Sequence, residues 1–253
     1  MQQAPEALPH GGTLYRYKNL ASTMDEAKTL AESGCPHHTF VLAESQTQAR
    51  GRQNRPWHSP KGHLYLSWVV RKWPKNCTVI NHLCFVVAVA VGQALEGLLP
   101  PESVQYKWPN DIWVCNRKCA GILIEVERDA QNQIQYFIVG VGINVASVAQ
   151  DPQISSYATS LVDQGVRTAT VEALWTFFHQ RLHHVWNIWH NQQFPAIRRL
   201  WLKRAYGLGE NICLTESGKR GKFVNINPEG HLILDTPEHE RLTISSADVW
   251  HTE

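Results

Sequence analysis

The sequence has no long hydrophobic run and no signal-peptide pattern. Its most apolar stretch, Cys84 to Val91, covers eight residues and is soon followed by Gln93 and Glu96, whereas a membrane-spanning helix needs about 20 apolar residues. The first ten residues contain no basic segment followed by an apolar core, as a signal peptide would. We therefore expect a cytoplasmic protein without a membrane role.

The sequence also lacks the patterns of disulfide frameworks and metal sites. Its six cysteines include no CxxC pair and no zinc-type spacing, so reduced, mostly structural thiols are expected. The neighbouring histidine pairs, at 37 and 38 and at 183 and 184, lack the three- or four-residue offset that places two ligands on one helix face. A formal net charge of only +2 argues against a general nucleic-acid binder. A positively charged binding site, if the protein has one, must therefore be confined to one part of the chain.

Capping and turn residues divide the first part of the chain into elements. Ser22 is a candidate N-cap for a helix over 23–33, with Asp25 in capping-box position and Gly34 as the stop. The remaining elements are predicted from apolar periodicity and polar punctuation: strands over 40–43 and 64–70, a buried helix over 78–99, and three or four antiparallel strands between 104 and 145.

The second part predicts one long amphipathic helix and a small all-β module. Thr170 is its candidate N-cap, and the apolar residues at helical spacing behind it are predicted to be core: Leu174, Phe177, Phe178, Leu182, Val185, Trp186 and Trp189. After Arg204, short alternating segments predict a separate β-barrel of about five strands. The class is therefore α+β, a mixed, mostly antiparallel sheet with packed helices followed by a small barrel, with domains at 1–206 and 207–253.

One loop concentrates charge. The segment Arg50 to Trp57 contains three arginines, one glycine and one tryptophan, and Gly51 lets its backbone approach a ligand closely. Arg50, Arg52 and Arg55 supply planar, permanently charged groups that suit phosphate or carboxylate oxygens. The Trp57 ring offers a face for stacking on a base. The alternative is a solvated surface loop, which composition alone favours.

A second candidate site is the turn over residues 107–111. Asp111 could hold a magnesium ion or accept a proton from an incoming amine. The alternative is structural, because proline, asparagine and aspartate are ordinary turn formers and Asn110 or Asp111 could simply cap the turn.

Two further segments lie at predicted strand ends. Lys118 opens a strand shortly before Gly121, where its point charge could stabilise a phosphate under attack, although most lysines are merely exposed. Gly140 and Gly142 place two small residues on one face of a strand, which permits close approach of a flat ligand or another backbone. No helix follows this strand at once, which rejects a dinucleotide-binding fingerprint.

Taken in order, these segments resemble the biotin protein ligase family, from about Leu20 to the barrel. Residues 107–111 are the family's KWPND motif unchanged. The other matching segments are Ser22 to Ala27, Gln46 with the Arg50 to Trp57 loop (a GRGRxxRxW-type loop), Lys118 with Ala120 and Gly121 (KxAG), Gly140 to Asn144 (GxGIN), and Ala158 to Leu161 (ATSL). The resemblance implies a biotin/lipoate ligase-like catalytic domain followed by an SH3-like β-barrel.

The resemblance also implies a two-step reaction. Biotin attacks the α-phosphorus of ATP, with Mg²⁺, to give biotinyl-5'-AMP, and a lysine of the biotin carboxyl carrier protein, a subunit of acetyl-CoA carboxylase, then accepts the biotin. The residues implied as catalytic are Lys118, Arg52 and Asp111. Those implied to bind biotin are Ser22, Thr23, Met24, Gln46, Arg50, Gly51, Arg52, Lys118, Gly121, Gly140 and Gly142. Those implied to bind ATP are Arg50, Arg52, Arg55, Trp57, Lys107, Asn110, Lys118 and Asn144.

The chain departs from the family pattern at the arginine loop and near its end. Ala49 replaces the usual glycine before the first arginine, and Gln53 and Asn54 replace a common arginine and glycine. Because asparagine tolerates left-handed backbone conformations best after glycine, the loop should keep its path. Residues 246–251 lack an arginine that some members carry.

The resemblance bears on partners as well. About twenty residues precede Ser22, too few for the helix-turn-helix domain of some members, so no DNA binding is expected. The sequence leaves a homodimer open.

Two alternatives to a biotin ligase are kept. The first is a lipoate or octanoate ligase or transferase, whose apolar acyl tail would not need Ser22 or Gln46 as partners. The second is a non-catalytic biotin-binding protein, against which Lys118, Asp111 and the three loop arginines stand.

Overall fold

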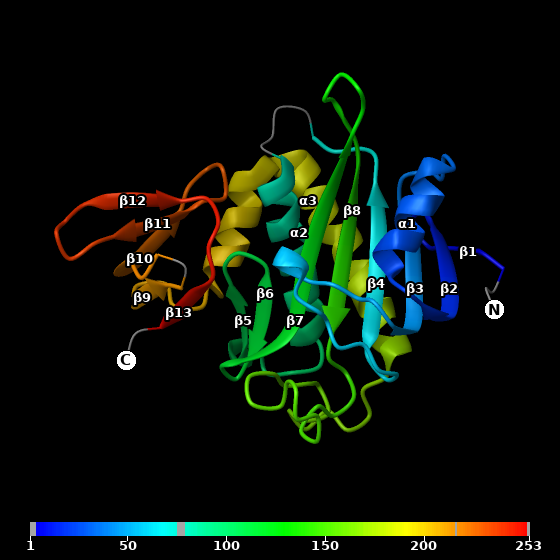
Figure 1. The fold of residues 1–253 in the computed structure, drawn as a ribbon, viewed down its shortest axis with the longest axis horizontal. Helices are drawn as coiled ribbons and strands as arrows, with labels where there is room; N and C mark the ends of the chain where they lie inside the picture. The colour runs from blue at the N-terminus through cyan, green and yellow to red at the C-terminus, as the bar shows by residue number, and fades with distance from the viewer. Residues whose placement is uncertain (1–3, 75–78, 216, 252–253) are drawn as a thin grey trace. The chain divides into compact units, whose positions relative to one another are not determined.

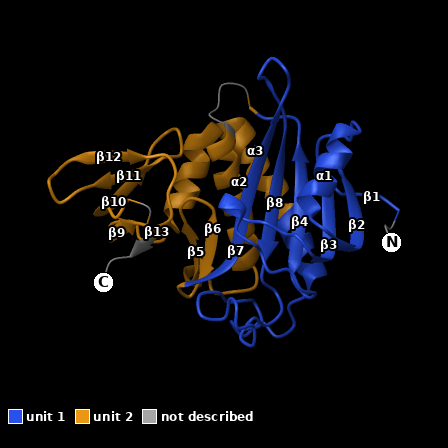
Figure 2. Ribbon diagram, in the orientation of Figure 1, with its two compact units in different colours: residues 1–73, 117–179 blue, residues 74–116, 180–253 orange. Residues whose placement is uncertain are grey.

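The computed structural model describes residues 4–74, 79–215 and 217–251 (Figure 1). The chain divides into two compact units, each built from two separate segments (Figure 2). Unit 1 comprises residues 1–73 and 117–179, and unit 2 comprises residues 74–116 and 180–253. The chain therefore passes between the units three times, at 73–74, 116–117 and 179–180.

Unit 1 contains a mixed sheet in which the strands follow the order β1-β2-β3-β4-β8-β7. Its strands are β1 (Glu6–Ala7), β2 (Thr13–Leu20), β3 (Thr39–Gln46), β4 (Leu64–Val70), β7 (Arg117–Arg128) and β8 (Ile134–Ile143). The β2–β3 pair is parallel and the other pairs are antiparallel. The predicted mixed, mostly antiparallel sheet is confirmed, although β2 was not predicted from the sequence.

Helix α1 (Thr23–Glu32) connects the two parallel strands and covers one face of this sheet. It begins as predicted, because Ser22 Oγ accepts a hydrogen bond from Met24 N at 3.2 Å. It ends at Gly34, which has a φ of +83° and so adopts the left-handed conformation that glycine favours. Met24, Ala27 and Ala31 form its buried stripe.

The opposite face of β3 and β4 is packed with aromatic side chains from the start of α3 (Val171–Leu202). The Phe40 and Trp175 rings meet edge to face at a centroid distance of 5.3 Å, and Thr170 caps the helix by accepting from Ala173 N at 3.2 Å. The prediction that Phe177 is core is wrong, since 39% of it is exposed. Phe177 lies just outside the buried face of α3, because a helical period of 3.6 residues allows only a narrow face to be buried.

Unit 2 contains α2 (Val79–Glu96), β5 (Val104–Lys107), β6 (Asp111–Val114) and the later part of α3. The two strands form the antiparallel hairpin predicted there, with Lys107 opposite Asp111. Helix α2 is buried as predicted, and its predicted start at Thr78 lies outside the described residues. Helix α3 contains a non-helical Gln193 two residues before Pro195, a break that the apolar periodicity did not predict.

The predicted all-β module is confirmed as a five-stranded antiparallel sheet in unit 2 with the order β12-β11-β10-β9-β13. Its strands are β9 (Asn211–Leu214), β10 (Arg220–Ile226), β11 (Leu232–Asp235), β12 (Arg241–Ile244) and β13 (Val249–His251). Alternate residues such as Phe223 and Leu234 are buried, as the period of two requires.

The helices and the cysteines of the described residues bear on two absences expected from the sequence, those of a membrane span and of a disulfide framework. None of their helices combines the length and the apolar character needed to cross a bilayer. The five cysteines among them are free thiols, and the sixth, Cys77, lies outside the described ranges. Burial raises the pKa of the Cys119 thiol to about 12, which makes it unreactive.

Candidate active site

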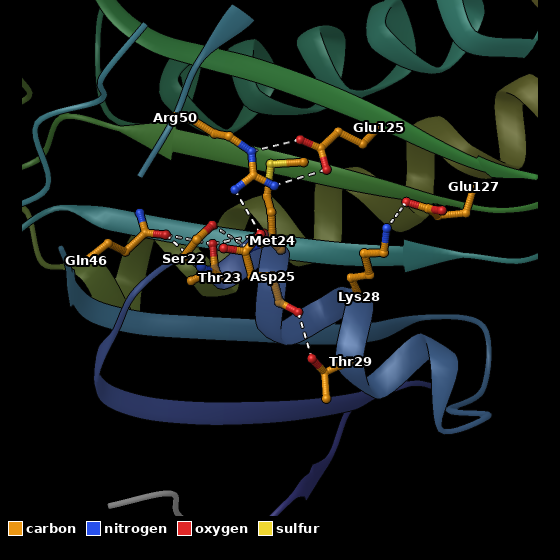
Figure 3. Close-up of polar contacts among 11 residues, drawn as sticks. Ser22, Thr23, Met24, Asp25, Lys28, Thr29, Gln46, Arg50, Glu125 and Glu127 are labelled. Carbon is orange, nitrogen blue, oxygen red and sulfur yellow. Dashed lines mark hydrogen bonds and ion pairs between the residues drawn. The ribbon is translucent and has the colours of Figure 1, made fainter. Parts of the chain in front are cut away.

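The turn before α1 holds a buried polar network (Figure 3). Gln46 Oε1, at the end of β3, accepts hydrogen bonds from the backbone N–H of Thr23 at 2.7 Å and from its hydroxyl at 3.1 Å. The Thr23 hydroxyl in turn accepts from Ser67 of β4 at 2.8 Å. Because Ser22 and Thr23 are each only 3% exposed, these bonds fix a set of polar groups inside the protein.

The same network leads to the arginine loop. The side-chain amide of Gln46 donates to Ser59 Oγ at 3.3 Å, and Ser59 donates to the Trp57 carbonyl at 3.0 Å. The amide of Gln46 and the hydroxyl of Ser22 each keep a further proton to donate. This corner of unit 1 can therefore recognise a polar ring that carries a carbonyl.

Beside this network, the sheet has a floor of small residues. The strand register aligns Tyr65, Gly142 and Gly121 across the sheet, and in the neighbouring row it pairs Ser67 with Gly140. Cross-strand partners point to the same face. The glycines therefore leave room above β7 and β8 on the face that α1 covers.

The side chains of Met24 and Trp57 occupy this space. A Cβ added at Gly140 would lie 2.7 Å from Met24 Sδ, and one added at Gly142 would lie 2.8 Å from Cε2 and Nε1 of Trp57. A Cβ at Gly121 would lie 3.0 Å from the same indole. The sequence predicted close approach at Gly140 and Gly142, but it did not indicate that Met24 and Trp57 make it.

The indole of Trp57 forms a wall of this site. The ammonium group of Lys118 lies 5.2 Å from the centre of the Trp57 ring, within the range of a cation–π contact. Within the described residues, the buried Trp57 Nε1 has no hydrogen-bond partner. Buried donors normally have partners, so this N–H is a group that a ligand acceptor would stabilise.

The arginine loop is a small hairpin closed by its own backbone. Gly51 N donates to the Arg55 carbonyl at 2.8 Å, and Trp57 N donates to the Ala49 carbonyl at 3.0 Å. The turn η1 (Arg52–Asn54) carries two left-handed residues, since Gln53 and Asn54 both have a φ of 56°. Asn54 thus adopts the left-handed conformation that asparagine tolerates, and Gln53 adopts the same conformation. That the loop keeps the path of the family pattern stays a prediction.

The three loop arginines differ in their surroundings. Arg50 is partly buried and bound by Asp25 and Glu125. Arg55 is exposed and donates to the side chain of Gln53 at 2.6 Å, whereas Arg52 is partly exposed at the loop tip. The family motif does not distinguish the three arginines, whereas the structure shows Arg50 held by two carboxylates of its own chain.

Lys118 is held at the start of β7 by backbone bonds. Its N–H donates to the Tyr157 carbonyl at 3.0 Å, and its carbonyl accepts from Thr159 N at 2.9 Å. The buried amide of Asn144 donates to the Thr159 carbonyl at 2.9 Å. The Ala158 to Leu161 segment thus links the two strand ends that carry Lys118 and Asn144.

A pocket of about 520 Å³ lies beside the exit of the arginine loop. It is lined by His58, Pro60, Lys61 and His63 and by residues of the 146–153 segment. His58 Nε2 lies 3.0 Å from Asp151 Oδ2 across it. The sequence does not indicate this pocket, because no motif marks the 146–153 segment.

His63 is the buried histidine of this pocket. Its Nδ1 accepts a hydrogen bond from Val145 N at 3.2 Å, which requires an unprotonated nitrogen. Burial lowers the pKa of His63 below its ordinary value, and the neighbouring His58 lowers it further. The neutral ring is therefore part of the folded pocket wall.

The motif over residues 107–111 belongs to unit 2 and forms the β5–β6 turn. Lys107 is only 7% exposed, and its ammonium group lies 4.2 Å from the centre of the Trp113 ring. Asn110 and Asp111 are half-buried at the turn. No group of three or more histidine, cysteine or acidic side chains in the described residues could hold a metal ion by itself.

Comparison with known proteins places the chain in a family. A model of the Biotin/lipoate A/B protein ligase family matches residues 18–144. The biotin--[acetyl-CoA-carboxylase] ligase of Paracoccus denitrificans is 34% identical over 239 residues, which cover 90% of this chain and 96% of that protein. The chain belongs to the Biotin/lipoate A/B protein ligase family.

Further members of the family agree over most of the chain. The bifunctional ligase/repressor BirA of Bacillus spizizenii is 32% identical over 240 residues, which are 91% of this chain and 71% of that protein. Among solved structures, the biotin protein ligase of Aquifex aeolicus, in complex with biotin and ATP, has a TM-score of 0.81 at 26% identity. The alignment covers 94% of this chain and 99% of that one.

Within the biotin/lipoate ligase fold, unit 1 gathers most of the residues expected from the sequence. A continuous set of contacts joins Thr23 to Gln46, Gln46 through Ser59 to Trp57, and Trp57 to Lys118 and two glycines. The remaining expected residues, Lys107, Asn110 and Asp111, lie in unit 2.

Proposed function

We propose that this protein is an ATP-dependent biotin protein ligase that acts as a biotin--[acetyl-CoA-carboxylase] ligase. A carboxylate oxygen of biotin attacks the α-phosphorus of ATP, and pyrophosphate leaves. The amine of a carrier-protein lysine then attacks the carbonyl of biotinyl-5'-AMP, AMP leaves, and the amine loses a proton. The observation that carries the proposal is the buried Thr23–Gln46–Ser67 network beside a glycine floor, in a chain whose relatives carry this activity.

The network supports recognition of the ureido ring of biotin. A buried urea needs acceptors for its N–H groups and donors for its carbonyl. Ser22, Thr23 and Gln46 supply hydroxyl and amide groups of both kinds. The thioether of Met24 and the floor at Gly140 then face the apolar part of the ring system. An octanoyl or lipoyl chain would leave these polar groups unpaired, which disfavours it.

The positive charges of the arginine loop and of Lys118 support adenylate formation. Arg52, Arg55 and Lys118 carry positive charge where the α-phosphate and the biotin carboxylate meet, and Lys118 stabilises the charge that grows during attack. Trp57, which packs against Gly142 and Gly121, covers the reacting groups. Keeping water away matters, because a mixed anhydride hydrolyses readily in solution.

The remaining roles fall to residues of the 107–111 turn, by their match to the family's KWPND motif. Asp111 accepts the proton of the attacking lysine, which near neutral pH is almost wholly protonated in water. Asn110 and Asp111 offer the hard oxygen atoms that Mg²⁺ prefers, and Mg²⁺ usually takes one or two carboxylates together with substrate phosphates. When bound, Mg²⁺ neutralises phosphate charge. Lys107 and Asn144 complete the ATP-binding set.

The proposal includes a domain division and a partner. Residues 1–206 form the catalytic domain and residues 207–253 the SH3-like barrel. The partner is the biotin carboxyl carrier protein, as the printed name of the Paracoccus denitrificans relative suggests. A cytoplasmic location and the absence of DNA binding stay predictions from the sequence. A homodimer stays an open alternative.

A transfer assay tests this function directly. The purified protein is incubated with biotin, ATP, Mg²⁺ and a biotin carboxyl carrier domain, and the carrier mass is measured. One biotinyl group should appear on the carrier, and none when its acceptor lysine is replaced by arginine. A carrier that stays unmodified, or that gains a lipoyl or octanoyl group in preference when those acids are supplied, would contradict the proposal.

A further inference from the structure

The side chain of Arg50 is bound on three nitrogens by carboxylates of its own chain (Figure 3). Nε and Nη2 donate to the two carboxylate oxygens of Glu125 at 2.9 and 3.1 Å. Nη1 lies 2.8 Å from Oδ1 of Asp25. Paired bonds between a guanidinium and a carboxylate are the strongest ion-pair geometry, and only 26% of the Arg50 side chain is exposed.

The charge balance of this cluster is negative. One guanidinium faces two carboxylates, so a phosphate or carboxylate that approached Arg50 would also meet Asp25 and Glu125. The hydrogen bonds that Arg50 donates to Glu125, and then the one to Asp25, raise the pKa of Arg50, so its charge is permanent. A cation stabilises a developing oxyanion best when its charge is not already neutralised. Arg50 is therefore poorly suited to contact the substrate anions.

The cluster joins three parts of the site instead. Asp25 lies in the first turn of α1, two residues after Thr23, and Glu125 lies on β7, the strand that carries Lys118 and Gly121. Arg50 forms the base of the arginine loop, where it pairs with Pro56 next to Trp57. Its ion pairs thus tie the loop to the turn on one side and to the strand on the other.

We propose that Arg50, Asp25 and Glu125 form an anchor for the arginine loop, in which the two carboxylates are positioning residues that act on the reaction only through Arg50. This inference rests on the proposed ligase function. The loop tip and Lys118 then contact the substrate anions, and Arg50 keeps Trp57 over the glycine floor. Weakening the anchor lets the loop open more often, which releases the adenylate without slowing its formation at saturating substrate.

The chain offers a matched control for this proposal. Glu127 lies on the same strand as Glu125 and bonds Lys28 of the same helix at 2.5 Å, but the arginine loop takes no part in that pair (Figure 3). Glu125→Gln and Glu127→Gln therefore each remove one carboxylate charge from β7, and each breaks an ion pair. Only Glu125→Gln removes a contact of the arginine loop.

The release rate of biotinyl-adenylate from the purified enzyme separates the two variants. Glu125→Gln should release it about tenfold faster, while the maximal rate of biotin-dependent pyrophosphate exchange stays within about twofold of wild type. Glu127→Gln should match wild type in both. An unchanged release rate in Glu125→Gln, or an equal change in Glu127→Gln, would overturn the anchor. So would a loss of maximal exchange as large as that of Lys118→Met.

A double-mutant comparison tests whether Glu125 acts through Arg50. Once Arg50→Gln has removed the guanidinium, adding Glu125→Gln should change the release rate by less than about twofold. Full additivity of the two effects would show that Glu125 acts separately. Asp25→Asn removes only one bond from a half-exposed carboxylate, so it should give a smaller increase and a folded protein even if the other variants unfold.

Trypsin cleavage tests the anchor without any ligand. In the wild-type protein the bond after Arg52 should be cut slowly, and Glu125→Gln should raise that rate several-fold while Glu127→Gln leaves it unchanged. Equal cleavage in all three proteins would overturn the anchor. If the wild-type protein made no adenylate, the ligase proposal would fail, and this assay would still decide whether the carboxylates hold the loop.

Discussion

The turn before α1 and the arginine loop are built in different ways. The turn is part of the secondary structure, with Ser22 as a helix cap, Gln46 at a strand end and both Ser22 and Thr23 almost fully buried. The loop is partly exposed, closes on its own backbone and is tied to the rest of unit 1 through the Arg50 ion pairs. The turn is fixed by the fold, whereas the loop is held by contacts that can be broken locally.

This difference suggests a division of roles between the two regions. A buried, hydrogen-bonded set of groups discriminates strongly, because a wrong ligand leaves polar atoms unpaired. A loop held by partly exposed ion pairs can open and close at low cost, which substrate entry and carrier access both require. We infer that the turn selects the acid and that the loop retains its adenylate.

The largest expected effect comes from the residue between the two regions. Lys118→Met should lower the maximal rate of pyrophosphate exchange by about a hundredfold or more, because its charge is needed mainly in the transition state. Biotin affinity, measured by calorimetry, should change by less than about threefold. A parallel loss of affinity and rate would mean that Lys118 serves binding rather than catalysis.

Breaking the turn should weaken recognition. Gln46→Ala leaves the buried N–H of Thr23 without its acceptor, at a cost of about 1–3 kcal/mol, and biotin affinity should fall at least tenfold. Gln53→Ala is the control in the loop, since Gln53 is exposed and its loss should change the free energy of unfolding by less than about 0.5 kcal/mol. If both variants bind biotin like wild type, the turn does not select the acid.

Filling the floor should affect both regions. Gly142→Ala places a Cβ 2.8 Å from the Trp57 indole, which should lower the free energy of unfolding by about 1–3 kcal/mol and shift the fluorescence of Trp57. Gly97→Ala is the control, because its new Cβ would have only one neighbour, the Ala94 carbonyl at 3.4 Å. Equal unfolding curves for wild type and Gly142→Ala would show that Trp57 does not lie on the floor.

The smallest effect is on acid stability. Burial holds the pKa of His63 below the ordinary value of 6.5, so the unfolded chain binds a proton at higher pH than the folded protein does. The contribution of His63 to stability is therefore complete above about pH 6.5 and is lost as the pH falls toward its folded pKa. His63→Gln should flatten the fall in melting temperature between about pH 7 and 5, and an unchanged slope would contradict this assignment.

Local signals in the sequence predicted much of the fold. Ser22 and Gly34 marked the ends of α1 almost to the residue, and the alternation over 64–70 predicted the bounds of β4. Strand β2 was missed, because Arg16 and Lys18 interrupt its apolar pattern while Leu14 alone is fully buried. Its parallel pairing with β3 was missed with it.

The candidate site was predicted as a set of residues but not as a geometry. Local motifs identified Lys118, Trp57 and the glycines of β7 and β8, and the structure joins them. They could not show that Arg50 is bound by Glu125, because that pair spans 75 residues of sequence. The pocket lined by the 146–153 segment was not predicted for a similar reason, since its lining comes from two separate segments.

Exchange of labelled pyrophosphate into ATP by the wild-type protein with Mg²⁺, measured first with biotin and then with lipoate, shows directly which acid the turn selects. The buried polar turn predicts rapid exchange with biotin and little or none with lipoate. Equal exchange with both acids would contradict selection by the turn. Exchange with lipoate alone would assign the chain to the other ligase of its family, and no exchange with either acid would contradict a ligase.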